Sequence, residues 1–248
     1  MTTGRISPQT TVGPRAPFVA RLSSLAKLSE PEVDLLAELG RHREVHRPGD
    51  ELTVEGDPAR RPRFILSGWA SNQHILSDGR RQVFGFAVPG DGLGVYPRMA
   101  PPSLYTTVAH TALVTVDAMP FLDAVRTAAM PGLVKAFTAV ARLEDKMLLD
   151  QILRLGRQTA YERVAHFLLE IEERLSAVGL SERRRFPLPL TQEILADALG
   201  LSVVHVNRTL QQLRRDGLIE WRSGVATLLD RDLLMSVAEY HATGRKLL

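Results

Sequence analysis

Residues 188–228 limit the possible folds more than any other stretch, because they carry the start and stop signals of two short helices in close succession. Thr191 is a favoured N-cap for the first helix, and Gly200 provides the left-handed residue that commonly ends one. Ser202 is a favoured cap for the second helix, and a hairpin with its turn near Ser223 follows. This order of elements predicts a winged helix-turn-helix.

The second of these helices has two different faces. One side carries apolar residues at helical spacing and is expected to be buried. The side chains on the other face suit phosphate oxygens and base edges, and they are His205, Asn207, Arg208, Gln211, Arg214 and Arg215. Since a winged helix-turn-helix lays this helix in the major groove, the sequence predicts a DNA-binding protein. The alternative is a small helical subdomain with a solvated polar face.

Charge and cysteine content narrow the function classes further. The chain has 248 residues, enough for two domains, and a formal net charge of only +3, so a DNA-binding surface must be local. It contains no cysteine, which excludes disulfides, thiolate zinc sites and cysteine-held iron–sulfur clusters. No run reaches the roughly 18 apolar residues that a membrane helix needs, and the start lacks the apolar core of a secretory signal. We therefore expect a cytoplasmic protein without a membrane partner.

The chain divides into four expected parts. Residues 1–17 are rich in Thr, Pro and Gly and are expected to form a flexible tail. Over 18–130 turn signals recur at roughly ten-residue spacing, as in an antiparallel barrel or sandwich. Residues 131–157 predict one long helix, and residues 158–248 contain the helix-turn-helix.

The predicted helix over 131–157 is longer than a small domain needs, because it would extend roughly 40 Å at about 1.5 Å per residue. Its apolar side chains form a broad stripe, and such a helix usually pairs with a copy of itself. We therefore expect a homodimer. The residues expected in the dimer interface are Leu133, Phe137, Val140, Met147, Leu148 and Ile152. The alternative is a long helix folded back on the barrel.

This order of parts resembles the Crp/Fnr superfamily of bacterial transcription regulators, over residues from about 20 to 245. In the barrel the resemblance rests on short motifs such as Glu55-Gly56-Asp57 and Pro89-Gly90-Asp91, and Leu199–Ile219 is the most specific match. It implies an α+β fold with an N-terminal cyclic-nucleotide-binding-like β jelly roll, a long dimerisation helix and a C-terminal winged helix-turn-helix. It also implies a regulator rather than an enzyme, one that binds a palindromic operator as a homodimer and contacts RNA polymerase.

The segment that would bind a ligand differs from the corresponding segment of the family members that bind cyclic AMP. Those members use a Glu for the ribose hydroxyl and an Arg-Ser/Thr pair for the phosphate, since a buried phosphate needs a guanidinium or equivalent donors. Val95 stands about where the Glu would be, and Ser103-Leu104 stand where the pair would be. Arg98 could substitute but lies several residues early. The sequence therefore argues against cyclic AMP, and the effector is unknown or absent. The residues expected in the effector pocket are Gly94, Val95, Tyr96, Arg98, Ser103 and Leu104.

Two other chemistries for the barrel stay open. Haem is not excluded because the chain has seven histidines, although His74 and His110 lie on predicted strands, where an ordinary barrel histidine is the commoner explanation. The alternative function is a cupin-like metal-dependent barrel enzyme with an autoregulatory DNA-binding domain. Such an enzyme needs several histidines and a carboxylate on neighbouring strands, and the sequence contains no such cluster. We expect no metal site and predict no cofactor.

The resemblance also implies how the second helix would contact double-stranded DNA. Arg208 aligns with the arginine that takes a guanine, whose O6 and N7 accept two parallel N–H donors. Val204 replaces a glutamate that many members use for cytosine, and a valine can pack against a thymine methyl instead. The expected base contacts are Val203, Val204, Asn207 and Arg208. The expected contacts to the DNA backbone are Thr191, Gln192, Ser202, His205, Gln211, Arg214, Arg215, Arg222 and Ser223.

Overall fold

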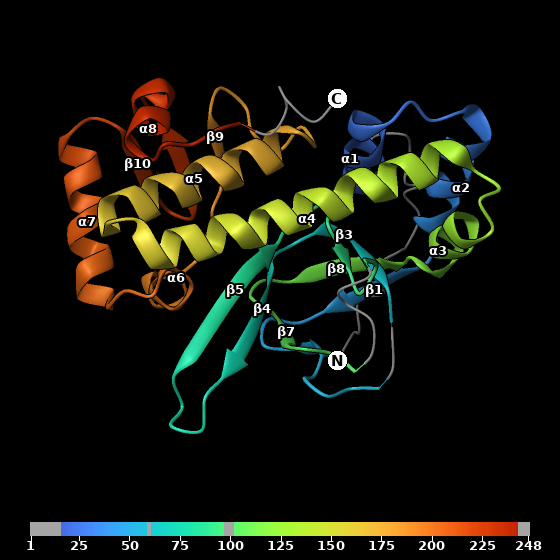
Figure 1. Ribbon diagram of the computed structural model, residues 1–248, viewed down its shortest axis with the longest axis horizontal. Coiled ribbons are helices and arrows are strands. Elements are labelled where there is room, and N and C mark those ends of the chain that lie inside the picture. The colour runs from blue at the N-terminus through green and yellow to red at the C-terminus, as the bar shows by residue number, and fades with distance from the viewer. Residues whose placement is uncertain (1–15, 59–60, 97–101, 243–248) are drawn as a thin grey trace, which may run out of the picture.

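The computed structural model describes residues 16–58, 61–96 and 102–242, and Figure 1 shows how their elements are arranged. The N-terminal half contains two four-stranded antiparallel sheets. The strands of the first sheet are, in spatial order, β1 (Arg43–His46), β8 (Leu113–Asp117), β3 (Arg63–Ser67) and β6 (Gly92–Leu93). Those of the second are β2 (Glu51–Thr53), β7 (Thr106–Ala109), β4 (Ala70–Ile75) and β5 (Arg81–Ala87). A small apolar core that includes Ile65, Ala87 and Leu113 joins the two sheets, as in a jelly-roll sandwich.

The tight turn between β3 and β4 depends on a glycine. Gly68 has a φ of +91°, and a Cβ at this position would lie 2.3 Å from the carbonyl oxygen of Ala112. Only glycine adopts this φ easily and leaves room for the neighbouring backbone, so this turn requires Gly68.

Three short helices cover one end of the sandwich, namely α1 (Pro17–Leu25), α2 (Glu30–Leu39) and α3 (Met119–Arg126). Phe18 of α1 is fully buried and stacks on Phe64 of β3 with ring centroids 4.9 Å apart. Since α1 begins at Pro17, the predicted tail over 1–17 extends one residue too far. The first 15 residues of that tail lie outside the described part of the chain.

One uninterrupted helix, α4 (Pro131–Arg157), runs along the molecule from these helices to the other end (Figure 1). Glu32 of α2 caps it, because its Oε1 accepts hydrogen bonds from the backbone N–H groups of Gly132 at 2.6 Å and Leu133 at 3.2 Å. Burial raises the pKa of the Glu32 carboxyl, but hydrogen bonds from Ser29, Leu133 and Gly132 outweigh it and hold that pKa below its ordinary value. The carboxylate thus stays charged at a helix N-terminus, where negative charge is favourable.

The C-terminal domain contains four helices and one small sheet. Its elements are α5 (Ala160–Ser176), β9 (Arg185–Pro187), α6 (Gln192–Leu199), α7 (Val203–Arg215), β10 (Ile219–Arg222), β11 (Val225–Leu228) and α8 (Arg231–Val237). The three strands pair in the antiparallel order β10-β11-β9. Leu168 of α5, Leu195 of α6 and Leu210 of α7 are fully buried in one core, which holds the helix-turn-helix against α5.

Strand β5 joins the sandwich to the C-terminal domain. Phe86 of β5 packs edge-on against Phe167 of α5, with ring centroids 5.5 Å apart. The Arg81 guanidinium binds the Asp197 carboxylate of α6, with Nε 2.8 Å from Oδ2. Arg174 of α5 donates to the carbonyl oxygen of Phe86 at 2.7 Å. The two halves are therefore joined by both apolar and charged contacts.

Candidate nucleic-acid interface and ligand pocket

The predicted caps of the helix-turn-helix are confirmed. Thr191 Oγ1 accepts a hydrogen bond from the backbone N–H of Ile194 at 3.3 Å, and Ser202 Oγ accepts one from His205 at 3.2 Å. Gly200 ends α6 with a φ of +63° and a ψ of +40°. These local signals fix the turn between α6 and α7, so the position of α7 follows from residues next to it in the chain.

The outer face of α7 presents apolar and cationic side chains to solvent. Val204 is 80% exposed and Val203 is 41% exposed, which is unusual for a branched apolar side chain on a structured helix. Arg208 is also exposed, and its guanidinium has no hydrogen bond or ion pair within the described ranges. An exposed, uncommitted guanidinium beside apolar groups is suited to the edge of a guanine and the methyl of a thymine.

The side chain of Asn207 makes two hydrogen bonds within the protein. Its Nδ2 donates to Gln192 Oε1 at 3.0 Å, and its Oδ1 accepts from Gln211 Nε2 at 2.8 Å. The three side chains therefore connect α6 to α7 in a short polar chain. A contact from Asn207 to a base, as expected from the sequence, would require one of these hydrogen bonds to break.

The predicted backbone contacts fall into two groups. Arg214 donates to the carbonyl oxygen of Trp221 at 2.9 Å and so ties α7 to the hairpin. Arg215 donates to Gln212 Oε1 at 2.6 Å and remains at the surface. Arg222 and Ser223 occupy the exposed tip of the hairpin, where Ser223 has a left-handed φ of +50°. The hairpin tip and the end of α7 thus add exposed cationic groups beside Arg208.

A cavity of about 300 Å³, here named the barrel pocket, lies where β5 faces α4. Its described lining residues are Asn72, Phe84, Gly85, Phe86, Tyr96, Tyr105, Ala141, Glu144, Asp145, Met147, Leu148, Arg154, Glu170 and Arg174. The size falls within the usual range for small-ligand sites, which is about 300–1,000 Å³. The two arginines already bind carboxylates, since Arg154 pairs with Glu170 at 2.6 Å and Arg174 pairs with Asp91 and Glu170.

The predicted effector-pocket residues are mostly not in this pocket. Tyr96 lines it, whereas Arg98 lies outside the described residues. Val95 is fully buried in the core between the sandwich and the surrounding helices, and Leu104 is 67% exposed. The remaining two, Gly94 and Ser103, are also absent from the described lining. Val95 therefore packs into the core and is not available to a ligand, whereas the expectation for Gly94, Ser103 and Leu104 stays a prediction that this pocket does not support.

Sequence reasoning missed Glu144, which with Asp145 is one of two acidic residues of α4 in the described lining of the barrel pocket. Burial, followed by the negative charge of Asp91, raises the pKa of the Glu144 carboxyl to about 7. The sequence does contain a signal for this residue. Glu144 follows the apolar Val140 by one helical turn and therefore lies on the same, barrel-facing side of α4. A carboxylate in that register is a candidate ligand contact.

We expect Glu144→Gln to stabilise the protein above neutral pH. The folded state holds the Glu144 proton more tightly than the unfolded chain, so the native free energy of unfolding falls as pH rises from about 4.5 to about 7. Glutamine removes this loss and should raise the free energy of unfolding at pH 8 by about 3 kcal/mol, with the gain fading below pH 5. Denaturant unfolding at several pH values and one protein concentration measures it. The exposed Glu38→Gln is the control, and equal stability of native and Glu144→Gln at pH 8 would contradict the expectation.

The structure corrects the predicted dimer interface. Leu133 and Val140 are buried inside the protomer, in the core that α4 shares with α1 and α3, so they are not available to a partner. Phe137 packs on Tyr96 and Phe121 of the same protomer. Met147 is half-buried and lines the barrel pocket. Leu148 and Ile152 do face solvent.

The exposed apolar residues of α4 gather in its C-terminal half. They are Leu148 at 41%, Leu149 at 65%, Ile152 at 61% and Leu153 at 46% exposure, and together they are named the α4 patch. Sequence reasoning missed Leu149 and Leu153, because the broad apolar stripe did not distinguish a side facing the barrel from one facing solvent. A contiguous exposed apolar group on a long helix is typical of a protein–protein contact.

Two absences hold for the described residues. The structure contains no group of three or more His, Asp or Glu side chains placed to hold a metal ion. None of the described helices combines the length and the apolar character that crossing a membrane requires.

Comparison with known proteins gives consistent matches. Residues 162–237 match the Crp-like helix-turn-helix domain. The chain is 36% identical over 177 residues to the transcriptional activatory protein AadR of Rhodopseudomonas palustris, covering 69% of this chain and 71% of that protein. It is 35% identical over 167 residues to the nitrogen fixation regulation protein FixK of Bradyrhizobium diazoefficiens, covering 67% and 69%. The solved structure of FixK2 from Bradyrhizobium japonicum superposes with a TM-score of 0.69 at 28% identity, covering 81% of this chain and 98% of that one.

Proposed function

Because the chain belongs to the Crp/Fnr family of transcription regulators, we propose that two copies pair through α4 and read a palindromic operator with their α7 helices. The observation that carries this proposal is the exposed, unpaired Arg208 on a helix whose start is fixed by the Ser202 cap. The relatives favour a regulator over the cupin-like barrel enzyme.

In this proposal α7 supplies the base contacts. Arg208 donates two parallel N–H groups to O6 and N7 of a guanine, and Val203 and Val204 pack against thymine methyls. Asn207 keeps α6 and α7 together through Gln192 and Gln211. Specificity therefore comes from one guanidinium and two apolar side chains in each half-site.

The backbone contacts come from groups around α7. The first N–H groups of α6 and α7, next to Thr191 and Ser202, point out of helix N-termini and suit phosphate oxygens. Arg215 and Arg222 add positive charge at the end of α7 and at the hairpin tip. Arg214 holds the hairpin in place through Trp221. These contacts would position the protein without reading sequence.

The proposed dimer uses the solvent-facing side of α4. The exposed apolar residues on this side are those of the α4 patch, Leu148, Leu149, Ile152 and Leu153, and they recur three or four residues apart, as in a coiled-coil seam. Pairing two copies here would set two α7 helices about one helical turn of DNA apart.

The barrel pocket is the proposed place for a signal, and Glu144 is its titratable contact. Its two arginines, Arg154 and Arg174, already pair with carboxylates, so a phosphate bound here would compete with Glu170 and Asp91 for them. Since one relative is named a transcriptional activatory protein, we also propose a contact with RNA polymerase.

Val204→Glu tests the reading of bases. A glutamate on this exposed position can accept a hydrogen bond from cytosine N4, which valine cannot, so the selected operator should change from thymine to cytosine at one position per half-site. Binding-site selection with native protein and variant side by side measures the change. The exposed Leu229→Glu, beyond the hairpin, is the control and should select the native sequence. Identical operators from Val204→Glu and native protein would show that this part of α7 does not meet bases.

A further inference from the structure

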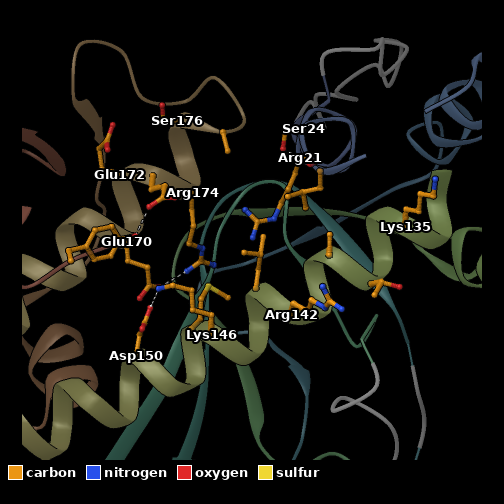
Figure 2. Close-up of a pocket in the computed structure, with 18 of the residues that line it drawn as sticks. Arg21, Ser24, Lys135, Arg142, Lys146, Asp150, Glu170, Glu172, Arg174 and Ser176 are labelled. Carbon is orange, nitrogen blue, oxygen red and sulfur yellow. Dashed lines mark hydrogen bonds and ion pairs between the residues drawn. The ribbon is translucent and has the colours of Figure 1, made fainter. Parts of the chain in front are cut away.

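A second and larger cavity lies on another side of α4 from the barrel pocket. It has a volume of about 790 Å³ and is here named the interdomain cleft, because α1 and α4 line one side of it and α5 and α8 line the other. Figure 2 shows Arg21 from α1 and Arg174 from α5 pointing toward one another above α4. The volume is that of a site for an organic molecule of ordinary size.

The cluster at the floor of this cleft has more positive than negative charge. Arg21 and Arg174 both pair with Asp91, and Arg174 shares Glu170 with Arg154. Three buried guanidinium groups thus face the two carboxylates of Asp91 and Glu170, and the Glu144 carboxyl, whose pKa is raised to about 7 by burial and by Asp91, interacts with Arg21 and Arg174 as a partly charged third group. The Nε groups of Arg21 and Arg174, two side chains that are only 5% and 7% exposed, have no hydrogen-bond acceptor among the described residues, and Arg21 Nε lies 3.6 Å from Asp91 Oδ1, which also lacks a hydrogen bond. A buried cation without full compensation is destabilising, so a further negative charge near the floor would be favourable.

At the rim of the cleft, too, the positively charged side chains outnumber the negatively charged ones that are free to pair with them. Its acidic side chains are already engaged, because Asp150 binds Lys146, Glu172 binds Arg231 at 3.2 Å and Glu173 accepts from Tyr240. In contrast, the charged lining residues that have no ion pair or side-chain hydrogen bond within the described ranges are all cationic, namely Lys135, Arg142 and Arg184. An anion entering the cleft would therefore meet uncommitted positive groups.

Between the floor and the rim the walls are apolar. They contain Leu25 of α1, with Val134, Ala139, Leu143 and Met147 of α4. Inorganic anions gain nothing from such walls, whereas a hydrocarbon or aromatic body is removed from water there. The favourable occupant therefore combines an apolar body with one anionic group.

We propose that the interdomain cleft binds an organic carboxylate with an apolar body, at a site that adjoins the barrel pocket and shares Met147, Glu170 and Arg174 with it. The carboxylate lies toward the arginine cluster and the cationic rim, and the apolar body lies along α4. Because the walls belong to both halves of the protein, an occupant contacts both and favours their present arrangement. The binding itself does not depend on the proposed DNA-reading function.

Calorimetry with octanoate on the full chain tests the site. We expect saturable binding of octanoate, weaker binding of octan-1-ol, which lacks the charge, and weaker binding of inorganic phosphate, which lacks the apolar body. The double variant Lys135→Ala/Arg142→Ala should lower octanoate affinity by roughly tenfold, as expected for two exposed cations. The exposed Arg157→Ala at the end of α4 is the control and should bind as the native protein does.

A matched pair of substitutions locates the binding. Ala139 lines the interdomain cleft and Ala141 lines the barrel pocket, two residues further along the same helix. Ala139→Phe should abolish octanoate binding, and Ala141→Phe should leave it intact. No saturable binding, equal binding of octan-1-ol, or blockage by Ala141→Phe alone would each overturn the proposal. Operator binding by the same variants is measured in parallel, so a failure of the DNA-reading function is seen separately.

Discussion

Ile152→Glu is expected to convert the dimer into monomers and to weaken operator binding by at least about a hundredfold. Ile152 is 61% exposed in the protomer and lies within the α4 patch. In a pair of α4 helices the new carboxylate would be an unpaired charge in apolar surroundings, which is strongly unfavourable. A monomer also loses the advantage of holding two half-sites at once, which amounts to roughly 10²–10⁴ in affinity.

Sedimentation at micromolar concentration and a titration of operator DNA measure the two effects. Leu233→Glu on α8 is the matched control, because Leu233 is 48% exposed and outside α4. It should remain dimeric and bind normally. A dimeric Ile152→Glu protein would place the interface elsewhere. Val140→Glu is not a substitute for this test, since Val140 is buried in the protomer and its replacement would unfold the chain.

Arg208→Ala should weaken binding to the preferred operator by about 1–3 kcal/mol per half-site, and so by roughly 2–6 kcal/mol for a symmetric dimer. The reason is that alanine cannot replace the two N–H donors aimed at a guanine. The loss should be confined to operators that carry that guanine, so discrimination at one position per half-site should disappear. Equilibrium titrations with native and guanine-substituted operators measure both quantities.

Two comparisons separate base reading from general charge. Arg126→Ala on α3 removes an equally exposed arginine from the other end of the molecule and should have no effect on operator affinity. Arg222→Ala at the hairpin tip should weaken all sequences about equally and reduce the salt dependence of binding. If Arg208→Ala behaves as Arg222→Ala does, with the same loss on every sequence, Arg208 contacts phosphate and not a base.

The elements that could be predicted from the sequence are those fixed by neighbouring residues. Thr191, Gly200 and Ser202 set the turn between α6 and α7 through contacts within three or four residues. The bounds of α4 were also predicted, because Pro131 suits the first turn of a helix and the apolar residues keep helical spacing from Leu133 to Leu155.

The parts that could not be predicted depend on contacts between distant residues. The apolar stripe of α4 includes Leu133 and Val140, which face the protomer core, and Ile152, which faces solvent. Periodicity alone assigns all three to one side. The pocket was placed by the alignment of a short cassette, but Val95 of that cassette is in the core. Arg81 and Asp197, which join the two halves, are 116 positions apart and carry no local signal.

Strand β5 limits how the domains of this protein can be exchanged with those of another regulator. Phe84 and Phe86 of β5 line the barrel pocket, and Arg81 of the same strand binds the first helix of the helix-turn-helix. The barrel and the helix-turn-helix therefore share an interface and are not independent modules. A chimera that grafts this barrel onto another DNA-binding domain would keep this ion pair only if the grafted helix carried a carboxylate at the place of Asp197. Without that carboxylate, the guanidinium of Arg81 would lose its partner across the junction, and the contacts of Phe86 with Phe167 and Arg174 would have to hold the two domains together.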